Sequence, residues 1–185
     1  VDPYGGIVFG TYNEDPDKIN RKPIANLYRL APDLSLTHLL SNITVSNGIA
    51  FSQNENIMYF ADTPTGLIRK FEFTHNFKKL QELESNMTFN DVGEPDGATV
   101  DINNNYWSAR VRGKCIICIN TKNGKIIEKI ELPTNTPTCV TFGDPDLSSL
   151  YVTSLRADPV NDAAGGNLHK IKTETKGFKQ LLTDI

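Results

Sequence analysis

The sequence lacks the features that mark membrane proteins and nucleic-acid-binding proteins. No apolar run among its 185 residues approaches the roughly 20 residues that cross a bilayer as a helix. It also lacks a basic excess, because 22 Asp and Glu residues outnumber 19 Lys and Arg residues and the formal net charge is −3. Proteins that bind phosphate backbones need clustered Lys and Arg. We therefore expect no membrane and no nucleic acid among its partners, and the sequence leaves the oligomeric state unknown.

Cysteine is scarce as well, with 3 residues in the chain. Cys115 and Cys118 lie three apart in a strand-like pattern, which sends their side chains to opposite faces. Their spacing therefore indicates neither a redox pair nor half of a zinc site. We expect buried free thiols in a reducing compartment, and hence a cytoplasmic protein. Two glycosylation sequons, at Asn42 and Asn86, would matter only in a secreted protein.

A repeated stretch organises the chain. An Asx-Gly pair that leads into strand-forming residues occurs at Asn47-Gly48 and again at Asp96-Gly97, 49 residues later. A degraded third copy, with Thr138 in place of the Asx residue, follows after another 42 residues. Intervals of this size are typical of β-propeller blades and are longer than helical or leucine-rich repeats.

Each repeat contains four short apolar stretches separated by Gly, Asn, Asp and Pro turns, the pattern of a four-stranded antiparallel blade. The predicted fold class is therefore all-β. We expect a single β-propeller domain over residues 1–185, built from units at about 1–43, 44–90, 91–135 and 136–185. The last unit should close with a strand over Phe178–Leu182.

The first unit has no Asx-Gly strand, so we expect the chain to begin inside a blade, as a fragment of a longer propeller. Two long polar loops, at 11–22 and 155–165, each follow the second strand of a unit. Both loops should emerge on the same side of the assembly. A functional site is expected on that side, because elaborated loops on a rigid scaffold commonly carry function.

The repeat positions predict a ring of polar side chains. Radial repetition should place Asn47, Asp96 and Thr138 at one depth around a common axis. Oxygen ligands that converge on an axis suit a divalent cation such as Ca²⁺ or Mg²⁺, and Zn²⁺ or Mn²⁺ would also accept them. The alternative is that Asn-Gly and Asp-Gly are simply turn dipeptides, and the pairs alone do not decide between the two.

At these same residues the sequence resembles the SMP-30/gluconolactonase/LRE family, which includes regucalcin, gluconolactonases and luciferin-regenerating enzyme. The resemblance covers nearly the whole chain. The matching stretches are VDPYGGIVFGTY (1–12), SNGIAFSQNENIMYFADT (46–63), PDGATVDINNNYWSARVRGKCI (95–116), LPTNTPTCVTFGDPDLSSLYVTS (132–154) and AGGNLHKI (164–171).

The resemblance implies a six-bladed propeller that binds one divalent cation and, in many members, hydrolyses sugar lactones. It further implies that Asn47 and Asp96 are metal ligands and that Asp96 is also the general base. A substrate-binding acidic residue would fall at Glu14 or Asp15. This sequence departs from the family in one respect: a metal-binding Glu, and a substrate-binding Arg and Asn that precede the Val-Asp-Pro segment, have no counterpart here.

Three functions stay open from the sequence. The first is a divalent-metal-dependent hydrolase of small lactones, incomplete in this fragment, with a cation as cofactor and a lactone as its small-molecule partner. The second is a non-catalytic calcium-binding or protein-interaction propeller, because Asn47 and Asp96 would serve either role. The third is a truncated product without function of its own. Trp107, Asp2 and Asp101 are expected to be structural, as a packing aromatic and as turn residues.

Overall fold

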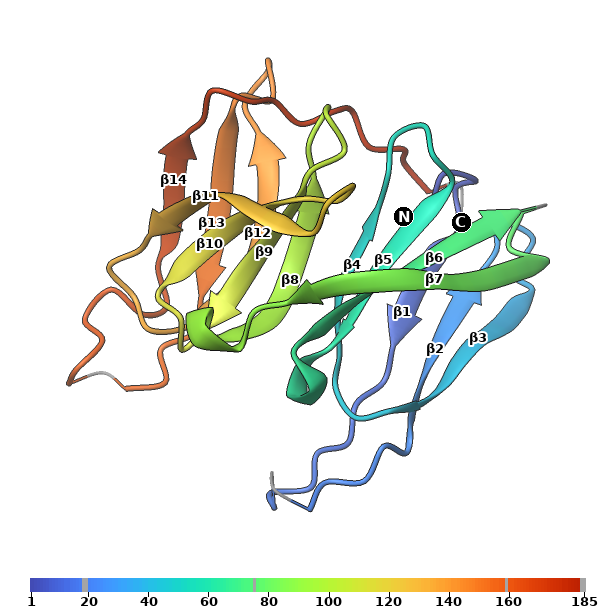
Figure 1. Ribbon diagram of the computed structural model, residues 1–185, viewed down its shortest axis with the longest axis horizontal. Coiled ribbons are helices and arrows are strands. Elements are labelled where there is room, and N and C mark those ends of the chain that lie inside the picture. The colour runs from blue at the N-terminus through green and yellow to red at the C-terminus, as the bar shows by residue number, and fades with distance from the viewer. Residues whose placement is uncertain (18–19, 75, 159, 184–185) are drawn as a thin grey trace.

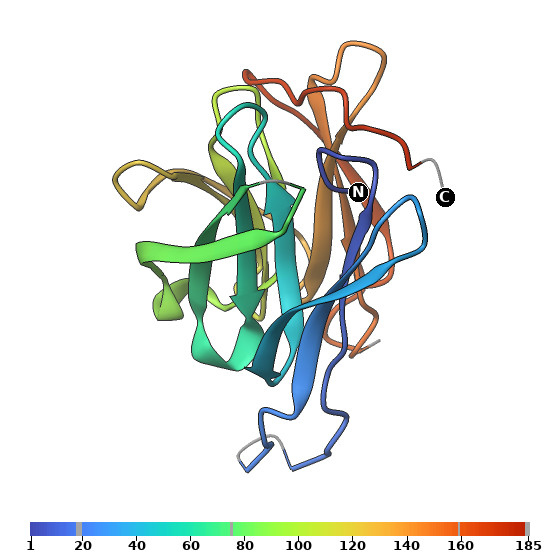
Figure 2. The ribbon, with the colours of Figure 1, turned by 90° about the vertical axis from the view of Figure 1, so that its right-hand side faces the viewer.

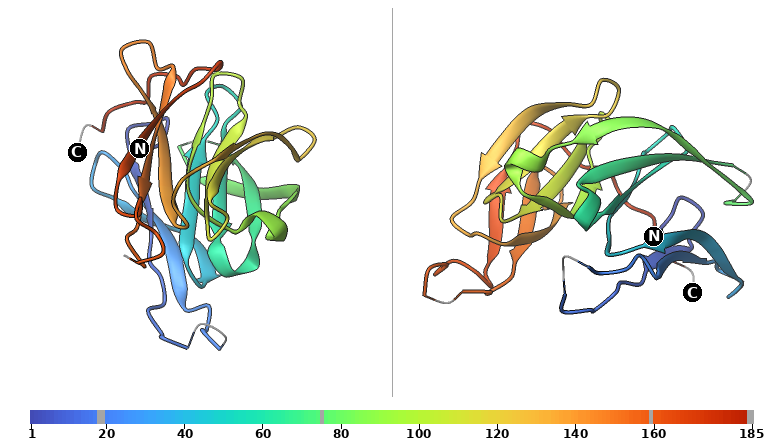
Figure 3. Two further views of the ribbon diagram at one scale, coloured as in Figure 1. Left: turned by 90° about the vertical axis from the view of Figure 1, so that its left-hand side faces the viewer. Right: turned by 60° about the horizontal axis from the view of Figure 1, so that its bottom comes forward.

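The computed structural model describes residues 1–17, 20–74, 76–158 and 160–183. These residues form four antiparallel sheets, which follow one another around an arc (Figures 1 and 3). No helix of the described residues is long and apolar enough to cross a membrane.

The first sheet contains β1 (Ile7–Gly10), β2 (Ala25–Leu30) and β3 (Leu36–Ile43), and the second contains β4 (Ser46–Phe51), β5 (Ile57–Asp62), β6 (Leu67–Thr74) and β7 (Lys79–Thr88). The third contains β8 (Glu94–Val100), β9 (Tyr106–Val111), β10 (Cys115–Asn120) and β11 (Lys125–Glu131), and the fourth contains β12 (Pro137–Gly143), β13 (Ser149–Ser154) and β14 (Leu168–Lys172).

Every sheet is a meander, so the order of strands in space follows their order in the chain. The strands β4, β8 and β12 each open a sheet, and β8 lies between β4 and β12 in contact with both. We call these three the inner strands. The first sheet has no counterpart of an inner strand among its described residues, because β1 pairs only with β2. The all-β propeller architecture predicted from the repeats is confirmed.

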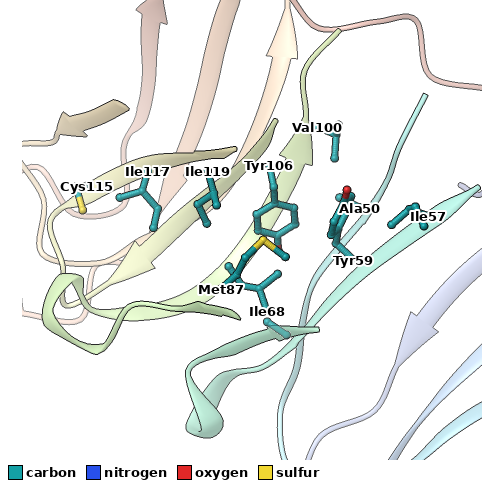
Figure 4. Close-up of a cluster of buried hydrophobic side chains, with 11 residues drawn as sticks. Ala50, Ile57, Tyr59, Ile68, Met87, Val100, Tyr106, Cys115, Ile117 and Ile119 are labelled. Atoms are coloured by element: carbon teal, nitrogen blue, oxygen red, sulfur yellow. The ribbon is translucent and has the colours of Figure 1, made fainter. Parts of the chain in front are cut away.

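Three hydrophobic clusters join the sheets in pairs. The cluster between the second and third sheets is drawn in Figure 4, where Tyr59 and Tyr106 lie against each other with ring centroids 5.3 Å apart. Cys115 belongs to this cluster, whereas Cys118 belongs to the cluster between the third and fourth sheets. The two thiols are free and point to opposite faces of β10, as the strand period predicts.

The prediction of a closing strand over Phe178–Leu182 is wrong, because these residues form no strand. After β14 the chain leaves the fourth sheet and crosses toward the first sheet along the upper edge in Figure 1. The carbonyl of Lys176 accepts a hydrogen bond from Ile102 N–H (2.9 Å), and the Thr183 hydroxyl donates to the carbonyl of Gly5 (3.0 Å). The two ends of this segment therefore bond to loops instead of to β14, and Phe178 packs against the cluster of the second and third sheets. Figure 2 shows the last part of the described chain beside its N-terminal segment.

The three residues expected to be structural have that role. Asp101 is fully buried and its carboxylate accepts hydrogen bonds from Asn103 N–H, Asn105 N–H and the Trp107 indole N–H. Trp107 itself is buried between the third and fourth sheets. Asp2 is buried and pairs with Arg29 at 2.5 Å.

A carboxylate in the fourth sheet makes stability depend on pH. Hydrogen bonds from Lys170 (2.8 Å), Ser149 (2.6 Å) and Tyr151 (2.7 Å) hold the pKa of Asp144 below its ordinary range. A carboxyl group with a lowered folded pKa stabilises the fold above its unfolded pKa of ~3.9, and this contribution is lost as the pH falls. Asp144→Asn should therefore lower the melting temperature at pH 7 and flatten its decline between about pH 5 and pH 2. Thermal unfolding across this range checks the prediction, and an unchanged acid profile would contradict it.

Candidate functional site

The inner strands share a local irregularity at the repeated polar positions. The pairing of β4 with β5 shifts between Asn47 and Ala50, and that of β8 with β9 shifts between Pro95 and Ala98. The pairing of β12 with β13 shifts next to Thr138, between the residues on either side of it. Each shift places one extra residue on the inner strand, which is a β-bulge. Asn47 directly precedes its bulge, whereas Asp96 and Thr138 lie within theirs, so all three repeated polar residues lie at the same kind of irregularity.

The Asx-Gly pairs therefore lie inside strands, and the alternative interpretation as ordinary turn dipeptides does not hold. Gly48 has a φ of 61°, a left-handed conformation that favours glycine. Gly97 is required by packing, because a Cβ atom there would lie 2.5 Å from the Cys139 sulfur and 2.8 Å from its Cα atom. The glycine thus allows β8 and β12 to approach closely beside Asp96.

A hydroxyl group connects the strands that carry Asn47 and Asp96. Thr63 begins η1 (Thr63–Thr65), the short 3-10 turn after β5. Asn47 Nδ2 donates to Thr63 Oγ1 (2.8 Å), and the same hydroxyl donates to the carbonyl of Pro95 (2.9 Å). The Asn47 amide is therefore two hydrogen bonds away from the residue that precedes Asp96. The expected separation of the two side chains, within about 5 Å of each other, stays a prediction.

Asp96 is half-buried on β8, and its surroundings disfavour its charge. Burial raises the pKa of its carboxyl to about 6, and a hydrogen bond from Gly97 N–H opposes this shift only in part. The neighbouring protein atoms raise the pKa of the Cys139 thiol, and the Asp96 charge adds to that rise. The charged form of Asp96 is thus poorly solvated, and the nearby Cys139 thiol is also disfavoured in its charged form.

Two of the predicted residues fit a hard divalent cation. The Asn47 amide nitrogen is occupied by Thr63, so its carbonyl oxygen is the atom left to bind a ligand. The Asp96 carboxylate is half-buried with an unfavourable charge, which a cation would offset. Within the described residues, no group of three or more His, Cys, Asp or Glu side chains is arranged to hold a metal. Asn47 and Asp96 could therefore supply only part of a coordination shell, and water or substrate oxygens would have to contribute to the rest.

The third ring position differs from the other two. The Thr138 hydroxyl is engaged with Thr153 Oγ1 at 2.9 Å, within the fourth sheet. It therefore has less capacity to bind a ligand than the oxygen atoms of Asn47 and Asp96.

The predicted substrate residues lie on a loop at the same edge of the molecule. The chain after β1 is fastened to the start of β4, because Asn13 N–H donates to the Thr44 carbonyl (2.9 Å) and the Ser46 hydroxyl donates to the Thr11 carbonyl (2.7 Å). This loop and the one after β13 both extend from the lower edge in Figure 1, where the inner strands begin. The prediction that the long loops share one side is confirmed.

The carboxylates of Glu14 and Asp15 are exposed and engaged within the loop itself. Tyr12 donates its hydroxyl to Glu14 (2.5 Å), and Asp17 N–H donates to Asp15 (2.9 Å). Their contact with a substrate beside Asn47 and Asp96 stays a prediction.

The opposite end of the inner strands is partly closed by the chain that follows β14. Two cavities of about 290 and 250 Å³ lie there, and both are lined by Phe51 and Gln180. Neither Asn47 nor Asp96 lines either cavity.

Sequence reasoning missed Thr63 and the bulges. Thr63 lies within a stretch that resembles the family, but a hydroxyl that joins two strands from different repeats leaves no periodic signal. A bulge is a difference in pairing between two strands, so it cannot be read from one strand alone. A polar residue that directly follows a buried strand, as Thr63 follows β5, was the available signal.

Comparisons with known proteins add independent evidence. Residues 1–156 match the family described as "SMP-30/Gluconolactonase/LRE-like region". Pentonolactonase XacC of Haloferax volcanii is 29% identical over 195 residues, a match that covers 100% of this chain and 65% of that protein. Regucalcin of Danio rerio is 30% identical over 162 residues, covering 83% of this chain and 52% of that protein.

A solved structure shares the architecture. Luciferin-regenerating enzyme superposes with a TM-score of 0.89 at 28% identity, and the match covers 100% of this chain and 63% of that one. This chain therefore spans between 52% and 65% of the length of the three similar proteins.

Proposed function

Because this chain belongs to the SMP-30/gluconolactonase/LRE-like family, we propose that the protein is a divalent-metal-dependent hydrolase of small lactones. The relatives include proteins named as lactonases, which supports a lactone-hydrolase role for the family. The observation that carries the proposal is the occurrence of Asn47 and Asp96 at bulges of the neighbouring inner strands β4 and β8, together with the half-buried state of the Asp96 carboxylate, whose pKa burial raises to about 6.

In this proposal Asn47 and Asp96 hold the cation through their side-chain oxygens. A divalent cation supplies Lewis acidity, which polarises a carbonyl group. The Asp96 carboxylate accepts a proton from the water that attacks the lactone carbonyl carbon. The ring C–O bond then breaks and the proton passes to the ring oxygen, so the product is an open-chain hydroxy acid. Glu14 and Asp15 are proposed to bind hydroxyl groups of the sugar.

A lactone assay after metal removal tests the proposal. The protein should lose activity on a sugar lactone in EDTA and regain it with at least one of Ca²⁺, Zn²⁺, Mn²⁺ or Mg²⁺. Calorimetry with the same cations, done in parallel, separates the hydrolase from a non-catalytic calcium-binding propeller. Cation binding without turnover of any lactone would overturn the hydrolase and support that alternative.

A further inference from the structure

We propose that Thr63 is a positioning residue, which orients the Asn47 amide and joins it to the β8 bulge that carries Asp96. This inference rests on the proposed function, because it assigns a role beside the same cation site. The hydroxyl of Thr63 bonds to Asn47 and to Pro95 and, among the described residues, to neither Asp96 nor the loop of Glu14 and Asp15. Thr63 therefore acts on the site through Asn47 and Pro95.

The hydrogen-bond capacity of a hydroxyl determines which end of the Asn47 amide faces Thr63. A threonine hydroxyl has one proton to donate, and here it donates to the carbonyl of Pro95 (2.9 Å). It can therefore only accept a hydrogen bond from Asn47, which requires the NH₂ group to face it, at 2.8 Å. The amide carbonyl oxygen, the atom that binds a cation, consequently points away from Thr63.

The turn that carries Thr63 is itself fastened to the start of β4. Thr63 N–H donates to the carbonyl of Val45 (3.1 Å). The preceding carboxylate, that of buried Asp62, accepts from Thr44 N–H (2.9 Å) and Val45 N–H (2.8 Å). Thr63 therefore has a fixed position relative to Asn47, and the hydrogen bond from its hydroxyl to Pro95 connects this turn to β8 of the neighbouring sheet.

The same turn contains a matched control. Thr65 is also a threonine of η1, but its hydroxyl donates to the Asp62 carbonyl (2.7 Å) and accepts from Leu67 N–H (3.2 Å). Both of these partners lie within the second sheet and its turn. Removing the Thr65 hydroxyl should thus weaken the turn without releasing Asn47 or the β8 bulge.

The test compares Thr63→Val, Thr63→Ser and Thr65→Val by calorimetric titration with Ca²⁺ and with Mn²⁺, alongside their melting temperatures. Thr63→Val keeps the branched shape and removes the hydroxyl, so the Kd for the cation should rise by about 10–100-fold, the usual loss when a group that orients a metal ligand is removed. Thr63→Ser and Thr65→Val should stay within about 3-fold of the unsubstituted protein. Without metal, the side-chain NH₂ resonances of Asn47 should shift in Thr63→Val only.

The outcomes distinguish this inference from the proposed function. If the unsubstituted protein binds a cation and Thr63→Val binds it equally well, the positioning role is overturned and the cation site stands. An equal loss in Thr65→Val would also overturn the role, because the effect would then belong to the turn as a whole. If the unsubstituted protein binds neither cation, the cation site and this inference fail together.

Discussion

Replacing Asp96 with Asn should lower lactone turnover by about 10²–10⁴-fold, the range typical of losing a general base. The substitution keeps the size of the side chain and one ligand oxygen, so β8 and its bulge should form as before. It removes the negative charge that holds the cation and the basic oxygen that accepts a proton from water. Steady-state kinetics on a sugar lactone at saturating metal measures the loss.

The stability of the same variant serves as its control. Burial raises the pKa of Asp96 to about 6, so above that pH the charged carboxylate is less favourable in the folded chain than in the unfolded chain. In metal-free buffer at pH 7.5, Asp96→Asn should therefore melt at the same temperature as the unsubstituted protein or higher. A folded variant with parental turnover at saturating metal would remove Asp96 from the mechanism.

Asn47→Ala should act mainly through the cation. The variant loses a neutral oxygen ligand but keeps the Asp96 carboxylate, so the Kd for the cation should rise while the proton acceptor remains. Losing one ligand or its support commonly weakens metal binding by at least ~10–100-fold. Titration of activity with increasing cation should therefore recover a large part of the turnover in Asn47→Ala. The same excess should recover much less in Asp96→Asn.

A matched substitution on an outer strand controls for the general effect of removing an asparagine side chain. Asn86 is exposed on β7, and its amide donates a long hydrogen bond (3.4 Å) to the carbonyl of Asn123. Asn86→Ala should leave both cation affinity and turnover unchanged. If excess cation failed to improve Asn47→Ala, Asn47 would be needed for something other than metal binding.

Much of the fold could be predicted from the sequence because a propeller repeats its signals. The repeats predict four strands in each complete unit, and the second and third sheets have four strands each. The opposite faces of Cys115 and Cys118 also follow from the strand period alone. Such features depend on local alternation and turn residues, which a single sequence contains.

The incorrect strand at Phe178–Leu182 shows where local reasoning stops. Its apolar residues suit a strand, but a strand also needs a partner edge. The residues on either side of the segment are held away from β14, since the Lys176 carbonyl bonds to Ile102 N–H and the Thr183 hydroxyl bonds to the Gly5 carbonyl. Whether a segment finds a strand to pair with depends on the whole fold, and the sequence of the segment itself does not show it.

The candidate site likewise contains some features that local sequence signals predict and others that they do not. Asn47 and Asp96 could be singled out because both recur at one repeat position. The bulges beside them depend on pairing between two strands of one sheet, and the hydrogen bond from the Thr63 hydroxyl to Pro95 joins two different repeats. Because no residue type marks such a pairing, only the three-dimensional arrangement reveals it.

The central claim is that neighbouring inner strands bring Asn47 and Asp96 to one cation. The most direct measurement is anomalous diffraction from crystals of the protein soaked in Ca²⁺. A single peak should lie ~2.3–2.6 Å from the Asn47 amide oxygen and from an Asp96 carboxylate oxygen, the distances usual for Ca²⁺ ligands. A Ca²⁺ peak bound elsewhere in the protein, with neither side chain among its ligands, would contradict the claim.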